Sequence, residues 1–343
     1  MSNNFENNEK DYENFEESIE NSYEKKKIKK ESIPHFFPTF RIKRNLYSIP
    51  IIISVICAAG LAYIASLYPE IKGTGGYFSE EDLGAWAGII NGFIFTAVAM
   101  FSAFLIIFLV KKKGIEVLKY VFGFSMGFIS FFLTWMFGEI ILYQIYMLFP
   151  ETETLNLIYN ILYFILLALY ALFSIMLIYK YFTTESIFIK NFTILYVSIL
   201  TGAMLGVTMP YWTTFAILIG ISLWDLFAVL TKKGPIKQMI DIVAGSKDPD
   251  VEEQVKKGEV EYDTSKLEIG IGDFAFYSML TSGALIITGN IFIMIFSAIA
   301  IIIGTGITIQ GLKKNKILPG LPISIFLGIA TMLISWAFVI YLI

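Results

Sequence analysis

Two aspartates, Asp225 and Asp273, stand in long apolar segments on either side of a hydrophilic stretch, residues 231–268. An ionised carboxylate inside a bilayer is costly, so an acid within a membrane segment indicates a functional site. Two carboxyl groups held close together can share one proton and activate a water molecule for hydrolysis of a peptide bond. The two residues therefore predict acid–base chemistry inside a membrane.

The spacing of the flanking segments places both acids at one depth. The first apolar segment ends near Leu230, and the second begins near residues 267–269. Each aspartate then lies about five residues inside its own helix, or roughly 7–8 Å below the same surface at about 1.5 Å of rise per residue. We expect Asp225 and Asp273 to form one catalytic pair.

The composition fits a membrane protein and excludes other kinds of site. Of 343 residues, 56% are hydrophobic and only 16% are charged, against about 25% charged in soluble domains. His35 is the only histidine, and Cys57 is the only cysteine. These counts exclude an HExxH zinc site, a Ser-His-Asp triad within the membrane and a disulfide framework. We expect neither a metal nor another cofactor.

Nine apolar segments are long enough to cross a bilayer, which predicts an all-α polytopic membrane protein. They lie near residues 46–68, 86–110, 117–149, 155–180, 187–208, 212–230, 269–288, 289–310 and 318–343. Residues 45–230 would thus hold helices one to six, residues 231–268 a hydrophilic loop, and residues 269–343 helices seven to nine. Residues 1–44 would form a disordered tail, or a basic segment that docks on anionic lipid head groups.

Loop charges orient these segments. Lysine-bearing connections, at residues 111–113, 180–190, 232–237 and 313–316, alternate with acidic or uncharged ones. The positive-inside rule then places the N-terminus in the cytoplasm and the C-terminus outside. The loop 231–268 and both aspartates accordingly lie toward the cytoplasm.

Other polar residues support or surround this site. Glu139 lies at a different depth, so we interpret it as a partner of a neighbouring helix or a snorkelling acid, and Asn91 as an interhelical hydrogen-bond partner. Residues 259–269 fit a short strand whose free edges would pair with an extended substrate backbone. Gly270 and Gly272 would allow close backbone approach beside Asp273.

Three short motifs resemble those of presenilins. Trp224-Asp225 resembles the YD motif of the sixth helix, and Gly270-Ile271-Gly272-Asp273 matches the GxGD motif. Pro319-Gly320-Leu321 takes the place of the PAL motif at the start of the ninth helix. Their order on a nine-span chain is similar to that of the presenilin family of GxGD intramembrane aspartyl proteases. Trp224 replaces the tyrosine of the first motif, and Gly320 replaces the alanine of the third.

The resemblance implies an aspartic endopeptidase that hydrolyses peptide bonds in or near the transmembrane helices of substrate proteins. Asp225 and Asp273 would activate the water, and Gly270, Gly272 and residues 319–321 would shape the site. The basic loops favour the presenilin orientation over that of signal peptide peptidases, which share GxGD but are inverted. We prefer a microbial homologue in the cell membrane, with no accessory subunit evident and no nucleic-acid partner; the oligomeric state stays open.

An ion-leak channel or a transporter is the alternative function, because such proteins also place paired acids in broken helices. A channel or transporter should show inverted repeats or a polar stripe through several spans, and the sequence shows neither. A membrane scaffold would explain the helices but not the matched aspartates.

The orientation is testable by labelling. In a Cys57→Ser background, Lys112→Cys and Lys314→Cys should react with a membrane-impermeant thiol reagent only from the cytoplasmic side. Glu81→Cys and Glu151→Cys should react only from outside. Labelling with the two sides reversed would contradict the assigned orientation.

Overall fold

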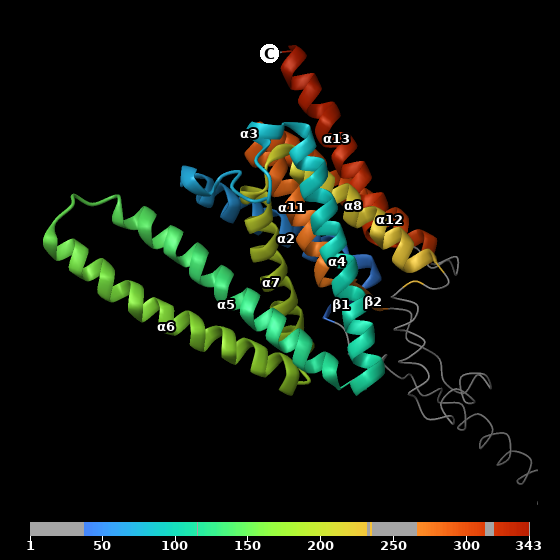
Figure 1. Cartoon of the computed structure of the whole chain (residues 1–343), viewed down its shortest axis with the longest axis horizontal. Coiled ribbons are helices and arrows are strands. Elements are labelled where there is room, and N and C mark those ends of the chain that lie inside the picture. Colours follow the sequence, from blue (N-terminus) through green and yellow to red (C-terminus); the bar gives the residue numbers. More distant parts are fainter. Residues whose placement is uncertain (1–37, 115, 232–233, 235–265, 313–318, 343) are drawn as a thin grey trace, which may run out of the picture. The chain divides into compact units, whose positions relative to one another are not determined.

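The computed structural model describes residues 38–114, 116–231, 234, 266–312 and 319–342. Nine helices in these ranges are long and apolar enough to cross a membrane (Figure 1), which confirms the predicted all-α polytopic fold. They are α2 (Ser48–Ser66), α4 (Ala85–Lys113), α5 (Val117–Tyr146), α6 (Glu153–Thr183), α7 (Ile187–Thr208), α8 (Tyr211–Leu230), α11 (Ile271–Thr288), α12 (Ile291–Leu312) and α13 (Leu321–Leu342).

Helix α11 is the core of this bundle. More than half of its apolar stretch is buried, 56%, against 11% for α4 and for α6. It contacts α2, α7, α8, α12 and α13, which surround it in Figure 1. A Cβ built on Gly202 of α7 would lie only 2.2 Å from the Cβ of Ser278 on α11. Small residues let membrane helices approach closely, so α7 and α11 pack with their backbones near one another and fix the helix that carries Asp273.

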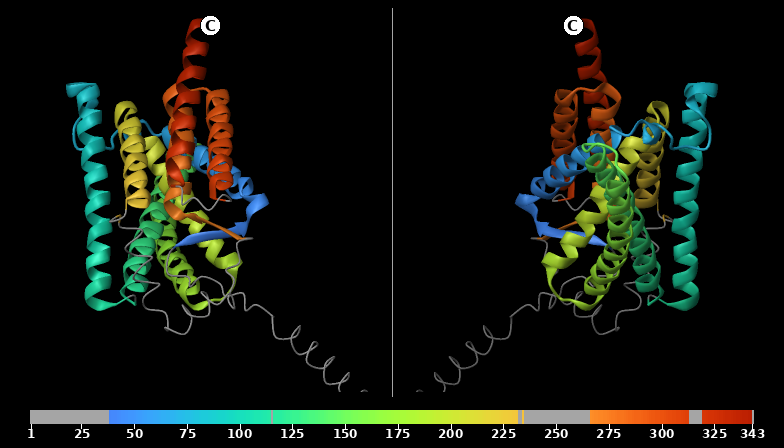
Figure 2. Two further views of the ribbon diagram at one scale, coloured as in Figure 1. Left: turned by 90° about the vertical axis from the view of Figure 1, so that its right-hand side faces the viewer. Right: turned by 90° about the vertical axis from the view of Figure 1, so that its left-hand side faces the viewer.

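A small antiparallel sheet lies at one end of the bundle. It pairs β1 (Thr39–Lys43) with β2 (Lys266–Gly270), and Figure 2 shows the two strands side by side. Thr39 lies opposite Gly270 in the register. The buried Phe40 ring meets Phe274 of α11 edge-on, with 5.5 Å between ring centroids.

Strand β1 corrects the expectation of disorder up to residue 44. Phe40 and Ile42 alternate with polar residues and pack against the core, and residues 39–43 gain ladder partners in β2, 223 or more positions away in the chain. The rest of the expected tail, residues 1–37, lies outside the described residues.

The outer edge of β1 is held by α7. The backbone N–H of Arg41 donates to Asn191 Oδ1, and Asn191 Nδ2 donates to the Arg41 carbonyl, each over 2.8 Å. Across the sheet, Arg41 Nε pairs with Glu268 Oε1 at 2.7 Å. The expected strand is therefore present in β2, but one of its edges is taken by β1; residues 259–265 lie outside the described residues.

At its first turn, α8 is tied to the connection between α2 and α4. Glu80, the first residue of the short helix α3 (Glu80–Leu83), accepts the backbone N–H groups of Trp212 and Thr213 over 3.1 and 2.6 Å. Asn91 Nδ2 donates to Thr213 Oγ1 over 3.1 Å, which confirms the predicted interhelical bond between α4 and α8. An acid at a helix N-terminus satisfies unpaired N–H groups and favours the helix dipole.

Candidate active site

Asp225 lies near the C-terminal end of α8, five residues before Leu230. Its side chain is partly buried, and its Oδ2 accepts a hydrogen bond from the backbone N–H of Leu321 over 3.2 Å. Leu321 is the first residue of α13, so its N–H has no acceptor within its own helix. The carboxyl of one helix thus satisfies a free donor at the start of another.

Asp273 lies at the start of α11, as its third residue. The expectation that this helix begins near residues 267–269, which put Asp273 about five residues inside, is wrong. The β1–β2 pairing keeps the chain extended through Gly270, and Ile271 N still donates to the Pro38 carbonyl over 3.2 Å. Asp273 Oδ2 accepts the Gly270 N–H over 3.1 Å, in the first turn where the helix dipole favours an anion.

The start of α13 lies beside both carboxyls. A Cβ built on Gly320 would lie 3.4 Å from each carboxyl oxygen of Asp273, while the next residue, Leu321, donates to Asp225. The Gly320–Leu321 segment therefore lies beside both acids, which brings Asp225, Asp273, Gly320 and Leu321 into one site. Among the described residues, no three His, Cys, Asp or Glu side chains gather in a way that could hold a metal ion.

The remaining predicted site residues differ in their contacts. A Cβ on Gly270 would lie 3.3 Å from Asp273 Oδ2, whereas the nearest atom to one on Gly272 would be a ring carbon of Phe276 at 4.0 Å. The close backbone approach beside Asp273 is thus made by Gly270 and not by Gly272. Pro319 is buried directly before Gly320.

Sequence reasoning did not find a group of buried hydroxyls behind Gly320. The hydroxyl of Tyr277 lies 3.2 Å from the Gly320 carbonyl oxygen and 3.3 Å from Ser324 Oγ. Thr305 Oγ1 of α12 is 3.0 Å from Ser324 Oγ. The available signal was spacing alone: Tyr277 follows Asp273 by one helical turn, and Ser324 follows Gly320 in the same way.

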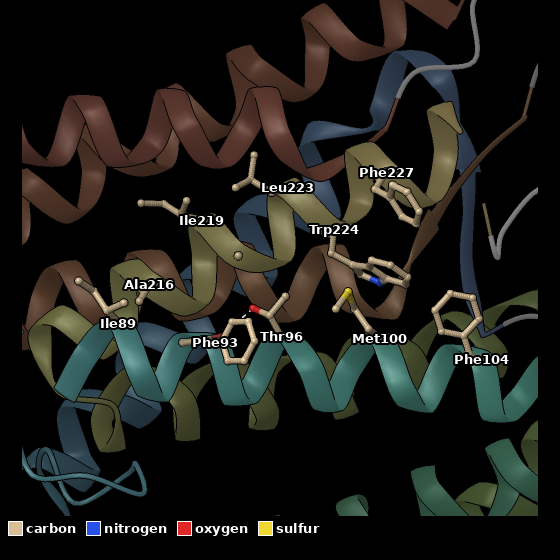
Figure 3. A pocket seen from close by; sticks show the side chains of 12 residues that line it. Ile89, Phe93, Thr96, Met100, Phe104, Ala216, Ile219, Leu223, Trp224 and Phe227 are labelled. Atoms are coloured by element: carbon tan, nitrogen blue, oxygen red, sulfur yellow. Dashed lines mark hydrogen bonds between the residues drawn. The ribbon is translucent and has the colours of Figure 1, made fainter. Parts of the chain in front are cut away.

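An apolar groove of about 730 Å³ runs between α4 and α8 (Figure 3). Trp224, the neighbour of Asp225, lines it and faces Phe104 of α4 with 5.9 Å between ring centroids. The other lining residues are Ile89, Gly92, Phe93, Thr96, Met100, Ala216, Ile219, Gly220, Leu223 and Phe227. The groove is therefore lined by Trp224 and Phe227, residues on either side of Asp225 in the sequence.

A model of the presenilin family matches residues 49–251 and 244–343. The chain belongs to the presenilin family. Together with the nine apolar helices found in the described ranges, this membership makes it an integral multi-pass membrane protein.

Three presenilin relatives illustrate the similarity. Presenilin-B of Dictyostelium discoideum is 39% identical over 124 residues, which are 35% of this chain and 25% of that protein. A presenilin-like protein of Arabidopsis thaliana is 23% identical over 334 residues, covering 75% of this chain and 80% of that protein. A presenilin homolog of Drosophila melanogaster is 25% identical over 164 residues, 47% of this chain and 28% of that protein. The chain therefore aligns with about a quarter of the Dictyostelium and Drosophila presenilins.

The contact of Gly320 with Asp273 predicts which side chains this presenilin tolerates at position 320. Gly320→Ala adds one methyl at ordinary contact distance, so the free energy of unfolding should change by less than about 0.5 kcal/mol. Gly320→Leu overfills the space and should cost about 1–3 kcal/mol.

Unfolding of the detergent-solubilised protein measures both changes. Gly60→Leu on α2 is the control, because nothing lies within 4 Å of a Cβ there, and it should leave stability unchanged. Equal stability of Gly320→Leu and Gly320→Ala would contradict the observed proximity to Asp273.

Proposed function

We propose that this presenilin-family protein is an intramembrane aspartic endopeptidase in which Asp225 and Asp273 activate the attacking water. One observation carries the proposal: Gly320 lies beside Asp273, since a Cβ built on it would be 3.4 Å from each carboxyl oxygen, and the next residue, Leu321, donates to Asp225. Acids from two different helices are thereby held beside one short backbone segment. Family membership supports the same class of reaction.

The chemistry follows from two adjacent carboxyls. Two ionised carboxylates in contact repel, so the pair holds one proton in its reactive form. The ionised carboxylate takes a proton from water as the water oxygen attacks the substrate carbonyl carbon, and the protonated carboxyl gives its proton to the carbonyl oxygen. The resulting gem-diol collapses when one of its hydroxyls returns a proton to a carboxylate and the leaving nitrogen takes the other carboxyl's proton, which breaks the C–N bond and restores the pair.

The second edge of β2 pairs with no other strand of the described residues, and this free edge offers a place for an unwound substrate segment. Ile271 N donates to Pro38 O, so by alternation Ile269 faces β1 while Glu268 and Gly270 turn their backbone groups to the other edge. On that edge the Gly270 N–H already meets the Asp273 carboxyl. A substrate strand paired with Glu268 would therefore continue directly toward the acid.

The α4–α8 groove suits the helical part of a substrate. Its lining is apolar except for the Thr96 hydroxyl and the Trp224 N–H, and Phe93 at its edge is 72% exposed, so a transmembrane helix would displace only lipid there. Trp224, which precedes Asp225 in α8, lines the groove (Figure 3). A channel or transporter would require a polar path instead, and this groove does not provide one.

Replacing either acid tests the proposed catalysis. Asp225→Asn and Asp273→Asn preserve shape but remove the shared proton chemistry, so each should lower cleavage of a single-span substrate by about a thousandfold or more. Cleavage by wild type should show a bell-shaped pH dependence that belongs to the pair.

Mass spectrometry of the products, with purified protein and a synthetic transmembrane substrate, measures this loss. Glu139→Gln is the matched control, an acid within α5 outside the pair, and should cleave at the wild-type rate. Wild-type cleavage by either Asn variant would refute the assignment.

The free edge of β2 has a separate test. Glu268→Pro removes the backbone donor on that edge without touching the groups that pair with β1, so it should reduce cleavage about tenfold, chiefly through KM. Glu268→Ala loses the Arg41 ion pair but keeps the N–H, and should stay within about threefold of wild type. Equal cleavage by the two variants would remove strand addition at this edge from the mechanism.

A further inference from the structure

One peptide group, at the start of α13, contacts both helices that carry the acids, α11 and α8. Its carbonyl oxygen, that of Gly320, accepts a hydrogen bond from the Tyr277 hydroxyl over 3.2 Å. Its N–H, that of Leu321, donates to Asp225 Oδ2 over 3.2 Å. Both ends of the Gly320–Leu321 peptide are thus occupied, one by a residue of α11 and the other by an acid of α8.

The planarity of the peptide couples these two contacts. The C=O and N–H of a trans peptide are fixed in one plane and point in opposite directions. A hydroxyl that holds the oxygen therefore also sets the direction of the N–H. It polarises the group as well, which strengthens the N–H as a donor to a carboxylate.

Buried hydroxyls hold Tyr277 in place. The Tyr277 side chain is 1% exposed and Ser324 is fully buried. Thr305 Oγ1 of α12 donates to the Tyr277 oxygen over 3.4 Å, and Ser324 Oγ adds a second donor to the Gly320 carbonyl, also over 3.4 Å. Hydroxyls of α11 and α13 therefore lie against one carbonyl oxygen, and a third hydroxyl, from α12, lies against those two.

We propose that Tyr277 is a positioning residue for the reaction: through the Gly320–Leu321 peptide it aims the Leu321 N–H at Asp225. The inference rests on the proposed protease function and adds to it a residue that touches neither acid by a hydrogen bond. Tyr277 also lies one turn after Asp273 on α11, so the helix that places one acid sets the donor of the other. A donor fixed in advance in a water-poor site stabilises charge without reorganisation during the reaction.

The first test compares two tyrosines. Tyr277→Phe removes only the hydroxyl and should lower kcat about ten- to a hundredfold while KM stays within about twofold, because the substrate does not contact the group. Tyr196→Phe is the matched control: its hydroxyl bonds Thr134 over 2.6 Å between α5 and α7, away from the acids. It should leave kcat and KM unchanged.

A double-mutant cycle tests the route through the peptide. Leu321→Pro deletes the N–H at the first position of α13, where proline is tolerated, and Leu321→Ala removes the side chain but keeps the N–H. Tyr277→Phe should cost the same factor in the Leu321→Ala background as in wild type, and nothing further in the Leu321→Pro background. If Leu321→Pro cleaves too slowly, the cycle is run on the affinity for a transition-state aspartyl inhibitor.

The outcomes of these experiments distinguish a failure of the positioning role from a failure of the proposed protease function. No cleavage by wild type refutes the protease itself. With an active wild type, a Tyr277→Phe kcat within twofold of Tyr196→Phe, or an equal cost in both Leu321 backgrounds, overturns the positioning role. If Tyr277→Phe does not fold, Thr305→Val, which removes the α12 hydroxyl beside Tyr277 and Ser324, should lower kcat about two- to fivefold; an unchanged kcat overturns the inference.

Discussion

An acid among apolar helices must meet hydrogen-bond donors, and here the donors come from the starts of two helices. The first backbone N–H groups of any helix have no acceptor of their own. Asp225 accepts one at the start of α13, from Leu321, and Asp273 accepts the Gly270 N–H just before α11. Each of these carboxyls thus gains a hydrogen-bond donor, and each of these backbone N–H groups gains an acceptor. The arrangement requires α11 and α13 to begin side by side, next to the C-terminal turns of α8.

The surrounding fold places those two starts. The β1–β2 pairing holds the chain extended up to Gly270, so α11 begins at Ile271 and no earlier. At the start of α13, the Tyr277 hydroxyl donates to the carbonyl of Gly320, the residue before Leu321. Close packing of α7 against α11 through Gly202 keeps the central helix from shifting relative to the rest. Among the described elements, which are otherwise helices, a two-stranded sheet therefore sets the position of the Asp273 carboxyl.

The amino-acid sequence predicts those features of the fold that leave a pattern in neighbouring residues. Apolar length predicted the nine spans, and the isolated acids Asp225 and Asp273 predicted the residues that the fold brings together. The strand β1 was missed because its partner lies 223 to 231 positions later in the chain, and the alternation of two apolar residues over five positions does not show which segment pairs with it. The predicted position of Asp273, five residues inside its helix, was wrong for the same reason. The contacts of the Tyr277 hydroxyl form only where α11, α12 and α13 meet. The spacing of residues along any one of these helices does not predict them.

The hydrogen bonds of Glu80 to the first turn of α8 have a mechanical consequence. They anchor this helix at the end opposite Asp225, so a tilt of α8 about that end would move the acid most. Thr213 and Asp225 are about 18 Å apart along the helix axis, and a tilt of about 5° would carry the carboxyl sideways by roughly 1.6 Å. That displacement is enough to make or break a hydrogen bond. Helix α8 carries the core residues Ile217, Leu218 and Ile221 between these two ends, so a change at Glu80 would move the acid together with the packing of α8.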